Sequence, residues 1–131
     1  MKATVSELQA FPIFAVLPDE KLEELCKQSE LRTYVDGDKL IREGEHNPYL
    51  FILRDGSVRV LSYGVEVARL ESGSVVGEVS TAGLSSPIAD VVASGTVTAI
   101  VFPSEVISTC AIEFDEFGER IRDTAMSRIL G

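Results

Sequence analysis

The sequence predicts a mainly β domain, a sandwich or a barrel, with helices at both ends. Short runs of β-branched or aromatic residues recur roughly every eight to twelve positions between about residues 31 and 103. Glycine, aspartate and asparagine separate these runs, as turns require. On both sides of this region, apolar residues recur at helical spacing instead.

The length and composition are those of a single globular domain. A chain of 131 residues can bury one core without disulfides or metal. We expect a helical lead-in over about residues 1–30, the β region over about 31–103 and C-terminal helices over about 104–130. The sequence shows neither an internal repeat nor a low-complexity linker that would divide it.

The stretch LPDEKLEELCKQS predicts an amphipathic helix. Pro18 suits a first turn, and the acids that follow it suit the positive end of the helix dipole. Leu22, Leu25 and Cys26 repeat at helical spacing. Before this helix, the apolar stretch AFPIFAVL is broken by Pro12, which predicts a short helix or a turn packed under the main fold.

The helical period returns near the C-terminus. SEVISTCAIEF begins with Ser104, which is a candidate N-cap. FDEFGERIRDTAMSRILG predicts a last helix. Its apolar stripe consists of Phe117, Ile121, Ala125 and Ile129.

Glycines set the expected corners of the β region. In FILRDGSVRVL, the pair Asp55-Gly56 favours the positive φ angles of a two-residue turn, so we expect a hairpin there. The other glycines expected at corners are Gly37, Gly44, Gly64, Gly73, Gly77 and Gly95.

Charge and composition exclude several classes of partner. A net charge of −9 without a basic cluster argues against direct binding of nucleic acid and against anionic membrane surfaces. The absence of a long apolar run argues against membrane insertion, and together with the lack of a signal peptide it predicts a cytoplasmic location. Cys26 and Cys110 are expected to be buried thiols, because they form no metal or redox spacing.

The sequence contains no constellation typical of catalysis. Its one histidine, His46, lies beside Asn47-Pro48 and is expected in a loop. Nucleophilic triads, metal-ligand spacings and paired carboxylates in an evident cleft are all missing. We therefore expect no enzyme activity and no metal site.

Two motifs resemble the cyclic nucleotide-binding domain family: KLIREGEHNPYLFILRDGSVRVL and LESGSVVGEVSTAGLSSPIADVVA. The resemblance extends from about Phe14 to the C-terminal helix. It implies an eight-stranded double-sheet jelly roll with N-terminal and C-terminal α-helices. The second motif looks like the family's phosphate-binding cassette, so the resemblance also implies a regulatory domain that binds cyclic AMP or cyclic GMP.

The resemblance assigns the first half of a ligand site. Gly77 and Glu78 match the family's Gly-Glu pair. In the family, this glutamate accepts a hydrogen bond from the ribose 2′-hydroxyl. The backbone N–H groups of Val79 and Ser80 match those that face the cyclic phosphate. The residues themselves leave a second interpretation open, because Glu78 could equally cap a short helix with no ligand present.

The second half departs from the family. Pro87 and Ala89 match, and Ala89 would donate its backbone N–H, but the phosphate arginine falls on Ile88. Asp90 stands where the family usually has a small neutral residue. On a regular strand the side chains of Ile88 and Asp90 share a face, so we expect Asp90 to repel the phosphate. Together the two changes predict binding weaker by roughly three orders of magnitude. A cation from elsewhere could rescue it, and the candidates are Arg42, Arg59 and Arg69.

The sequence therefore favours a regulatory ligand-sensing module with weak or altered cyclic nucleotide binding. Its ligand would be a cyclic nucleotide or another small molecule. The C-terminal helix would move as a lid and act on an attached effector domain or a protein partner. The alternative is a ligand-independent interaction domain, for example of a homo-oligomer, that keeps the jelly roll as a scaffold.

Overall fold

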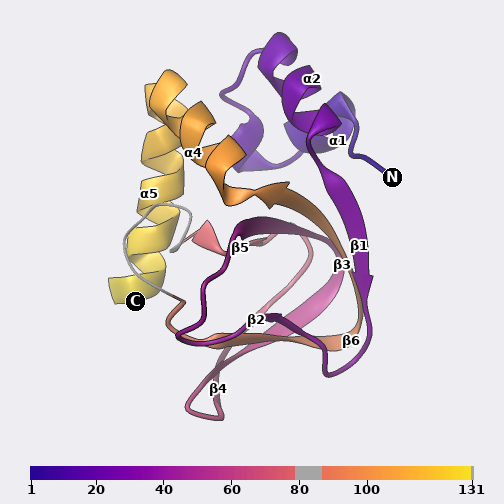
Figure 1. The fold of residues 1–131 in the computed structure, drawn as a ribbon, viewed down its shortest axis with the longest axis vertical. Helices are drawn as coiled ribbons and strands as arrows, with labels where there is room; N and C mark the ends of the chain where they lie inside the picture. Colours follow the sequence, from indigo (N-terminus) through magenta and orange to yellow (C-terminus); the bar gives the residue numbers. More distant parts are fainter. Residues whose placement is uncertain (79–86, 131) are drawn as a thin grey trace.

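The fold is a curved antiparallel sheet with helices gathered at one end (Figure 1). The computed structural model describes residues 1–78 and 87–130, with side chains through Ser127. Within this part of the chain the strands are β1 (Glu30–Tyr34), β2 (Lys39–Ile41), β3 (Tyr49–Ser62), β4 (Val65–Leu70), β5 (Val75–Val76) and β6 (Asp90–Pro103). The strand order is β1-β6-β3-β4, with β2 also paired to β6 and β5 to β3. The mainly β prediction with flanking helices is confirmed.

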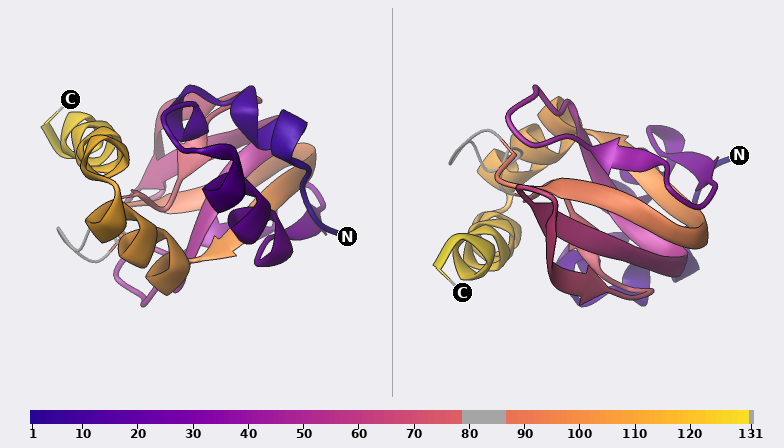
Figure 2. Two further views of the ribbon diagram at one scale, coloured as in Figure 1. Left: turned by 90° about the horizontal axis from the view of Figure 1, so that it is seen from above. Right: turned by 90° about the horizontal axis from the view of Figure 1, so that it is seen from below.

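The helices lie before and after the strands in the sequence. They are α1 (Val5–Gln9), the 3₁₀ helix η1 (Pro12–Phe14), α2 (Asp19–Lys27), α4 (Ser104–Glu113) and α5 (Asp115–Leu130). Figure 2 shows, from above, the N-terminal helices and α4 together over the end of the sheet. In Figure 1, α5 runs down one side of the sheet. None of the helices in residues 1–78 and 87–130 has the length and apolar character that a membrane crossing needs.

In residues 1–78 and 87–130 the strands are fewer and longer than the eight that the resemblance implied. β3 continues through Asp55 and Gly56, so the predicted hairpin at this pair is wrong. β6 likewise continues through Gly95. Gly56 has φ +92° and Gly95 has φ +76°, and the register between the two strands shifts beside Asp55. The glycines therefore bend two paired strands together instead of reversing the chain, as bulges do.

Buried side chains form two clusters that share β3. Leu50 and Ile52 pack toward the helices, whereas Phe51 and Leu53 face the interior of the curved sheet. Both faces of β3 are therefore buried here, which explains the unbroken apolar run YLFIL. A strand with one solvent-exposed face would alternate apolar and polar residues. On the helical side, the Phe14 ring lies 5.6 Å from that of Phe102 and 5.8 Å from that of Phe117.

The helix predictions hold with small shifts. The stretch AFPIFAVL contains η1, as expected, and α1 is an additional helix. Ser104 is wrong as an N-cap: it is the first residue of α4, and Pro103 occupies the cap position without a side-chain hydrogen bond. The stripe of Phe117, Ile121 and Ala125 is buried as predicted, while the side chain of Ile129 lies outside the described residues.

Both cysteines are buried free thiols, as the sequence predicts. Cys110 is fully buried, and loss of contact with water raises its pKa to about 11. Because the thiolate is the nucleophilic form, Cys110 is unreactive near neutral pH.

Candidate functional site

A pocket of about 570 Å³ opens between the sheet, the 87–91 segment and α5. This volume is within the range of small-molecule sites, which is about 300–1,000 Å³. Most lining side chains are aliphatic. The lining residues are Ile41, Val60, Ser62, Val67, Ala68, Leu70, Val76, Gly77, Glu78, Pro87, Ile88, Ala89, Val91 and Ser127. Five of the eight residues predicted for the site are among them.

Gly77 is required by close packing at the end of β5. It has φ +92°, and a Cβ there would lie 2.6 Å from the carbonyl oxygen of Tyr49 and 2.9 Å from Nδ2 of Asn47. Asn47 is itself fixed, because its Nδ2 donates to the Tyr49 carbonyl at 2.8 Å and its Oδ1 accepts from the Tyr49 N–H at 3.2 Å. Only glycine, which has no Cβ, allows the backbone at position 77 to lie this close to Tyr49 and Asn47.

Glu78 follows this close contact and brings a carboxylate into the pocket lining. The residue is only 2% exposed. A buried carboxylate is a strong acceptor for hydroxyl or amino groups of a ligand. The same burial fits the capping interpretation, so both roles of Glu78 stay predictions. The predicted N–H donors of Val79 and Ser80 lie outside the described residues.

Residues 87–89 form one wall of the pocket. Pro87 and Ala89 are buried, whereas Ile88 is 46% exposed while still lining the pocket. The side chain that the resemblance matches to the phosphate arginine is therefore an apolar group at the edge of the cavity. It supplies neither charge nor a hydrogen bond.

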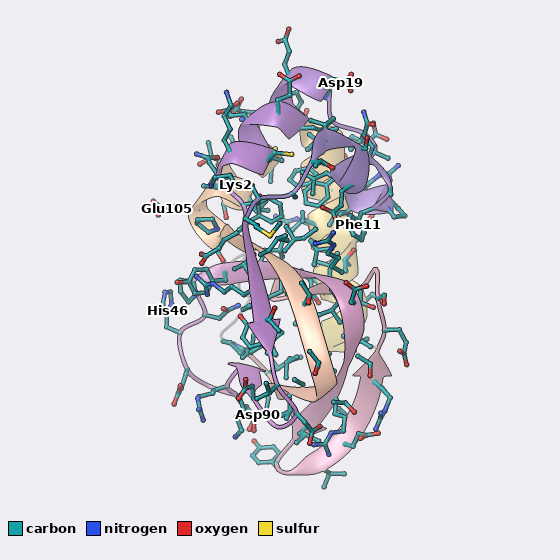
Figure 3. The ribbon with its side chains drawn as sticks, turned by 90° about the vertical axis from the view of Figure 1, so that its right-hand side faces the viewer. Lys2, Phe11, Asp19, His46, Asp90 and Glu105 are labelled. Atoms are coloured by element: carbon teal, nitrogen blue, oxygen red, sulfur yellow. The ribbon has the colours of Figure 1, made fainter. Side chains whose placement is uncertain are left out.

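Asp90 does not lie where the sequence placed it. Its carboxylate accepts from the backbone N–H of Glu43 at 2.8 Å and from Nζ of Lys39 at 3.2 Å, and it is absent from the lining of the pocket. The chain bends at Ala89 and β6 begins at Asp90, with Val91 in the buried interior of the sheet. Figure 3 shows Asp90 low on the sheet, far from the N-terminal helices.

The contacts of Asp90 also explain its ionisation. The hydrogen bond from the Glu43 N–H, supported by the ammonium of Lys39, lowers the pKa of Asp90 below the ordinary aspartate value. The carboxylate is therefore charged and engaged on the outer side of the sheet. That this carboxylate repels a bound phosphate stays a prediction.

The described part of the pocket holds no compensating cation: neither lysine nor arginine lines it. The candidates from the sequence have other positions. Arg42 lies 3.9 Å from a carboxylate oxygen of Glu45, and Arg69 lies 3.3 Å from one of Glu66. Arg59 does not line the pocket either. The structure gives no support for a rescue by these three side chains.

Sequence reasoning expected the C-terminal helix as a lid, but it missed the contribution of β4 and did not single out Ser127. Val67 of β4 lines the pocket although it is 60% exposed, and Ser127 reaches the pocket from α5. No local signal marks Ser127, because its role depends on where the helix lies. His46 is exposed between β2 and β3, as predicted (Figure 3). Among the described residues, no group of three His, Cys, Asp or Glu side chains is placed to hold a metal ion.

Comparison with known proteins decides the family. The model of the cyclic nucleotide-binding domain matches residues 31–112, which is more than half of the chain. The chain belongs to the cyclic nucleotide-binding domain family. Members of this family are regulatory binding domains, generally without enzymatic activity. A relative by sequence is glutaminase 1 of Bradyrhizobium diazoefficiens, with 37% identity over 76 residues, which is 57% of this chain but only 12% of that protein.

Solved structures of this family share the fold. A cyclic nucleotide-binding protein from Geobacter metallireducens matches with a TM-score of 0.83 and 18% identity, over 98% of this chain and 96% of that one. The regulatory subunit of a cAMP-independent protein kinase A from Trypanosoma brucei matches with a TM-score of 0.83 and 23% identity, over 93% of this chain and 44% of that one. The regulatory subunit of a cAMP-independent protein kinase A from Trypanosoma cruzi, bound to guanosine, matches with a TM-score of 0.74 and 23% identity. This match covers 79% of this chain and 38% of that one.

Proposed function

We propose that this domain is a regulatory ligand sensor whose pocket takes an uncharged ligand of the nucleoside type, with cyclic AMP and cyclic GMP bound weakly. The observation that carries the proposal is the lining of the pocket. It combines a buried carboxylate, Glu78, with aliphatic walls, and Ile88 occupies the position of the phosphate arginine.

The charge balance works against a cyclic phosphate. A charge-assisted hydrogen bond from arginine is worth about 1.5–3 kcal/mol, and Ile88 offers none. Without that partner, a phosphate would lose its water at a net cost. An uncharged ligand avoids both penalties.

A nucleoside fits what is left of the family's site. Its ribose hydroxyls can donate hydrogen bonds to a buried carboxylate such as that of Glu78. Its base is largely apolar on both faces and suits the aliphatic walls formed by residues such as Val60, Leu70 and Val91. The Trypanosoma cruzi subunit, which shares the fold, is bound to guanosine. These points together support nucleosides as the first ligands to test.

Isothermal titration calorimetry with guanosine, adenosine, cyclic AMP and cyclic GMP tests the proposal. We expect the natural protein to bind a nucleoside more tightly than either cyclic nucleotide. Ile88→Arg should raise the affinity for cyclic AMP by about tenfold or more, because one charged hydrogen bond is worth that much. Its affinity for nucleosides should change by less than about threefold, since a nucleoside has no charge to pair with.

Ile112→Arg is the matched control. Ile112 lies on α4, is 81% exposed and does not line the pocket, so the same charge is added away from the site. It should leave all four affinities unchanged. Tighter binding of cyclic AMP than of nucleosides by the natural protein would contradict the proposal, as would no heat with any of the four at millimolar concentration.

The output of the sensor would run through α5. Ser127 of this helix lines the pocket, so a ligand in the pocket meets α5 directly. We propose that residues 1–131 act as one cytoplasmic domain, that α5 serves as its lid, and that an effector domain or partner protein responds to the position of this helix. This proposal extends the prediction made from the sequence.

The second candidate function is a ligand-independent interaction or oligomerisation domain. It is favoured by the exposed apolar residues of β4, the last strand in the strand order, where Val65 is 64% and Val67 60% exposed. Light scattering across a range of protein concentrations tests it with the full chain. A rising mass that Val65→Lys abolishes would support it, and a monomer at every concentration would exclude self-association.

A further inference from the structure

Asp90 joins the pocket wall to the chain between β2 and β3. It directly follows residues 87–89, which form that wall. Its Oδ1 accepts from the backbone N–H of Glu43 at 2.8 Å, and its Oδ2 accepts from Nζ of Lys39 at 3.2 Å. The β2–β3 connection (residues 42–48) is thus bonded to one end of the wall through a side chain that does not itself enter the pocket.

The other end of the wall is bonded to the same connection. The backbone N–H of Gly44 donates to the carbonyl of Pro87 at 2.9 Å. Two successive amides, those of Glu43 and Gly44, therefore hold Asp90 and Pro87, and Ile88 and Ala89 lie between these two anchors. The position of the residue that replaces the phosphate arginine is set from both sides.

The β2–β3 connection also contacts the first half of the site. Asn47 approaches Gly77 so closely that a Cβ on Gly77 would lie 2.9 Å from its Nδ2. One connection thus contacts Gly77, in the first half of the site, and is also bonded to Pro87 and Asp90. A change in its position would move both halves of the site.

We propose that Asp90 is a positioning residue that fixes the 87–89 wall against the β2–β3 connection, and that it is not an electrostatic barrier to anions. The charges around Asp90 agree with this role. Nζ of Lys39 lies 3.2 Å from the Asp90 carboxylate, so the ion pair has little net charge. The carboxylate also lies outside the pocket lining. The inference deepens the proposed function and rests on it for the identity of the ligand site.

The two roles of Asp90 predict effects of opposite sign. In an Ile88→Arg background, removal of an electrostatic barrier would strengthen cyclic AMP binding. Removal of an anchor would weaken it, because the arginine would no longer be held at the phosphate. We expect Asp90→Ala to weaken cyclic AMP binding at least about fivefold in calorimetry, as expected when a positioned group is released. Strengthened binding would overturn the proposal.

Two further variants separate the hydrogen bond from the ion pair. Asp90→Asn keeps an oxygen that can accept from the Glu43 N–H, so it should retain most of the affinity that Asp90→Ala loses. Lys39→Met removes only the ion pair and should behave like Asp90→Asn. Losses as large as that of Asp90→Ala in both variants would show that charge, and not the anchored amide, sets the effect.

Amide hydrogen exchange tests the anchor without any ligand. In Asp90→Ala we expect the amides of Glu43 and Gly44 to exchange at least about tenfold faster than in the natural protein, because their bonds hold the wall. The amide of Leu53, bonded to the Ser74 carbonyl at 2.9 Å, is the internal control and should keep its rate. Unchanged exchange at Glu43 and Gly44 would overturn the positioning role. Faster exchange there, with no ligand bound by any variant, would remove the proposed function and leave the positioning role standing.

Discussion

Gly77 shows how one residue determines the shape of the site. Its φ of +92° and the nearby Tyr49 carbonyl both exclude a side chain. We expect Gly77→Ala to lower the free energy of unfolding by at least about 2 kcal/mol, because a left-handed alanine alone costs about 1–2 kcal/mol and a backbone overlap is added. Urea denaturation followed by circular dichroism measures this loss.

Gly64→Ala is the control for this prediction. Gly64 has φ +79°, but a Cβ there meets nothing within 4 Å. It should therefore lose only the conformational part, about 1–2 kcal/mol. Equal losses for the two variants would mean that the packing of Tyr49 against Gly77 contributes nothing.

Asp90 gives the protein a pH-dependent contribution to stability. The Glu43 N–H and the Lys39 ammonium lower its pKa in the folded state. The stabilisation is therefore fully present above the unfolded aspartate pKa of about 4 and is lost as pH falls through the lower folded value. We expect Asp90→Asn to be less stable than the natural protein at pH 7, and the difference in unfolding free energy should shrink as pH falls below the unfolded aspartate value. A difference that does not shrink in acid would contradict this assignment.

The residues of the site could be predicted from sequence where a local rule was sufficient. The Gly-Glu pair and the replacement at Ile88 are visible in the motif, and both line the pocket. The partners of Asp90 could not be predicted, because Lys39 and Glu43 lie 51 and 47 residues away in the sequence. No local rule pairs side chains across such a distance.

Among the elements, α5 is held in part by an aromatic contact. Phe117 is fully buried and its ring is stacked 5.8 Å from Phe14 of η1. Arg120 adds a hydrogen bond from the same helix to the Pro12 carbonyl at 2.6 Å. Because the cavity could not fill without moving η1, we expect Phe117→Ala to cost about 3–5 kcal/mol in urea denaturation.

Arg122→Ala is the control on the same helix. Arg122 is exposed, so its loss should change stability by no more than about 0.5 kcal/mol. A small effect of Phe117→Ala, close to that of the control, would mean that α5 is held mainly by its other contacts.

The long strands illustrate what sequence reasoning misses at the level of elements. Asp55-Gly56 has the composition of a hairpin turn, yet β3 passes through it. The same φ > 0 serves a bulge or a turn equally well. The choice is made by β6, which pairs with β3 on both sides of Gly56. Pairing between distant segments is not encoded in any short window of sequence.

At the scale of the whole molecule, the order of helices and strands could be predicted, and the pocket could not. Its lining extends from Ile41 to Ser127 and draws on strands, a connection and the last helix. Composition and period locate each of these elements along the chain. Their meeting around one cavity follows only from the assembled sheet and from the docking of α5.

The pairing of β3 with β6 also sets the order in which the molecule can form. It joins Tyr49 to Pro103 at one end and Leu61 to Asp90 at the other, so tens of residues must be brought together before the first contact forms. Gly77 and the 87–89 wall lie inside the loop that this pairing closes. Refolding should therefore be slow for a chain of this size, and binding competence should appear only after the central pair has closed.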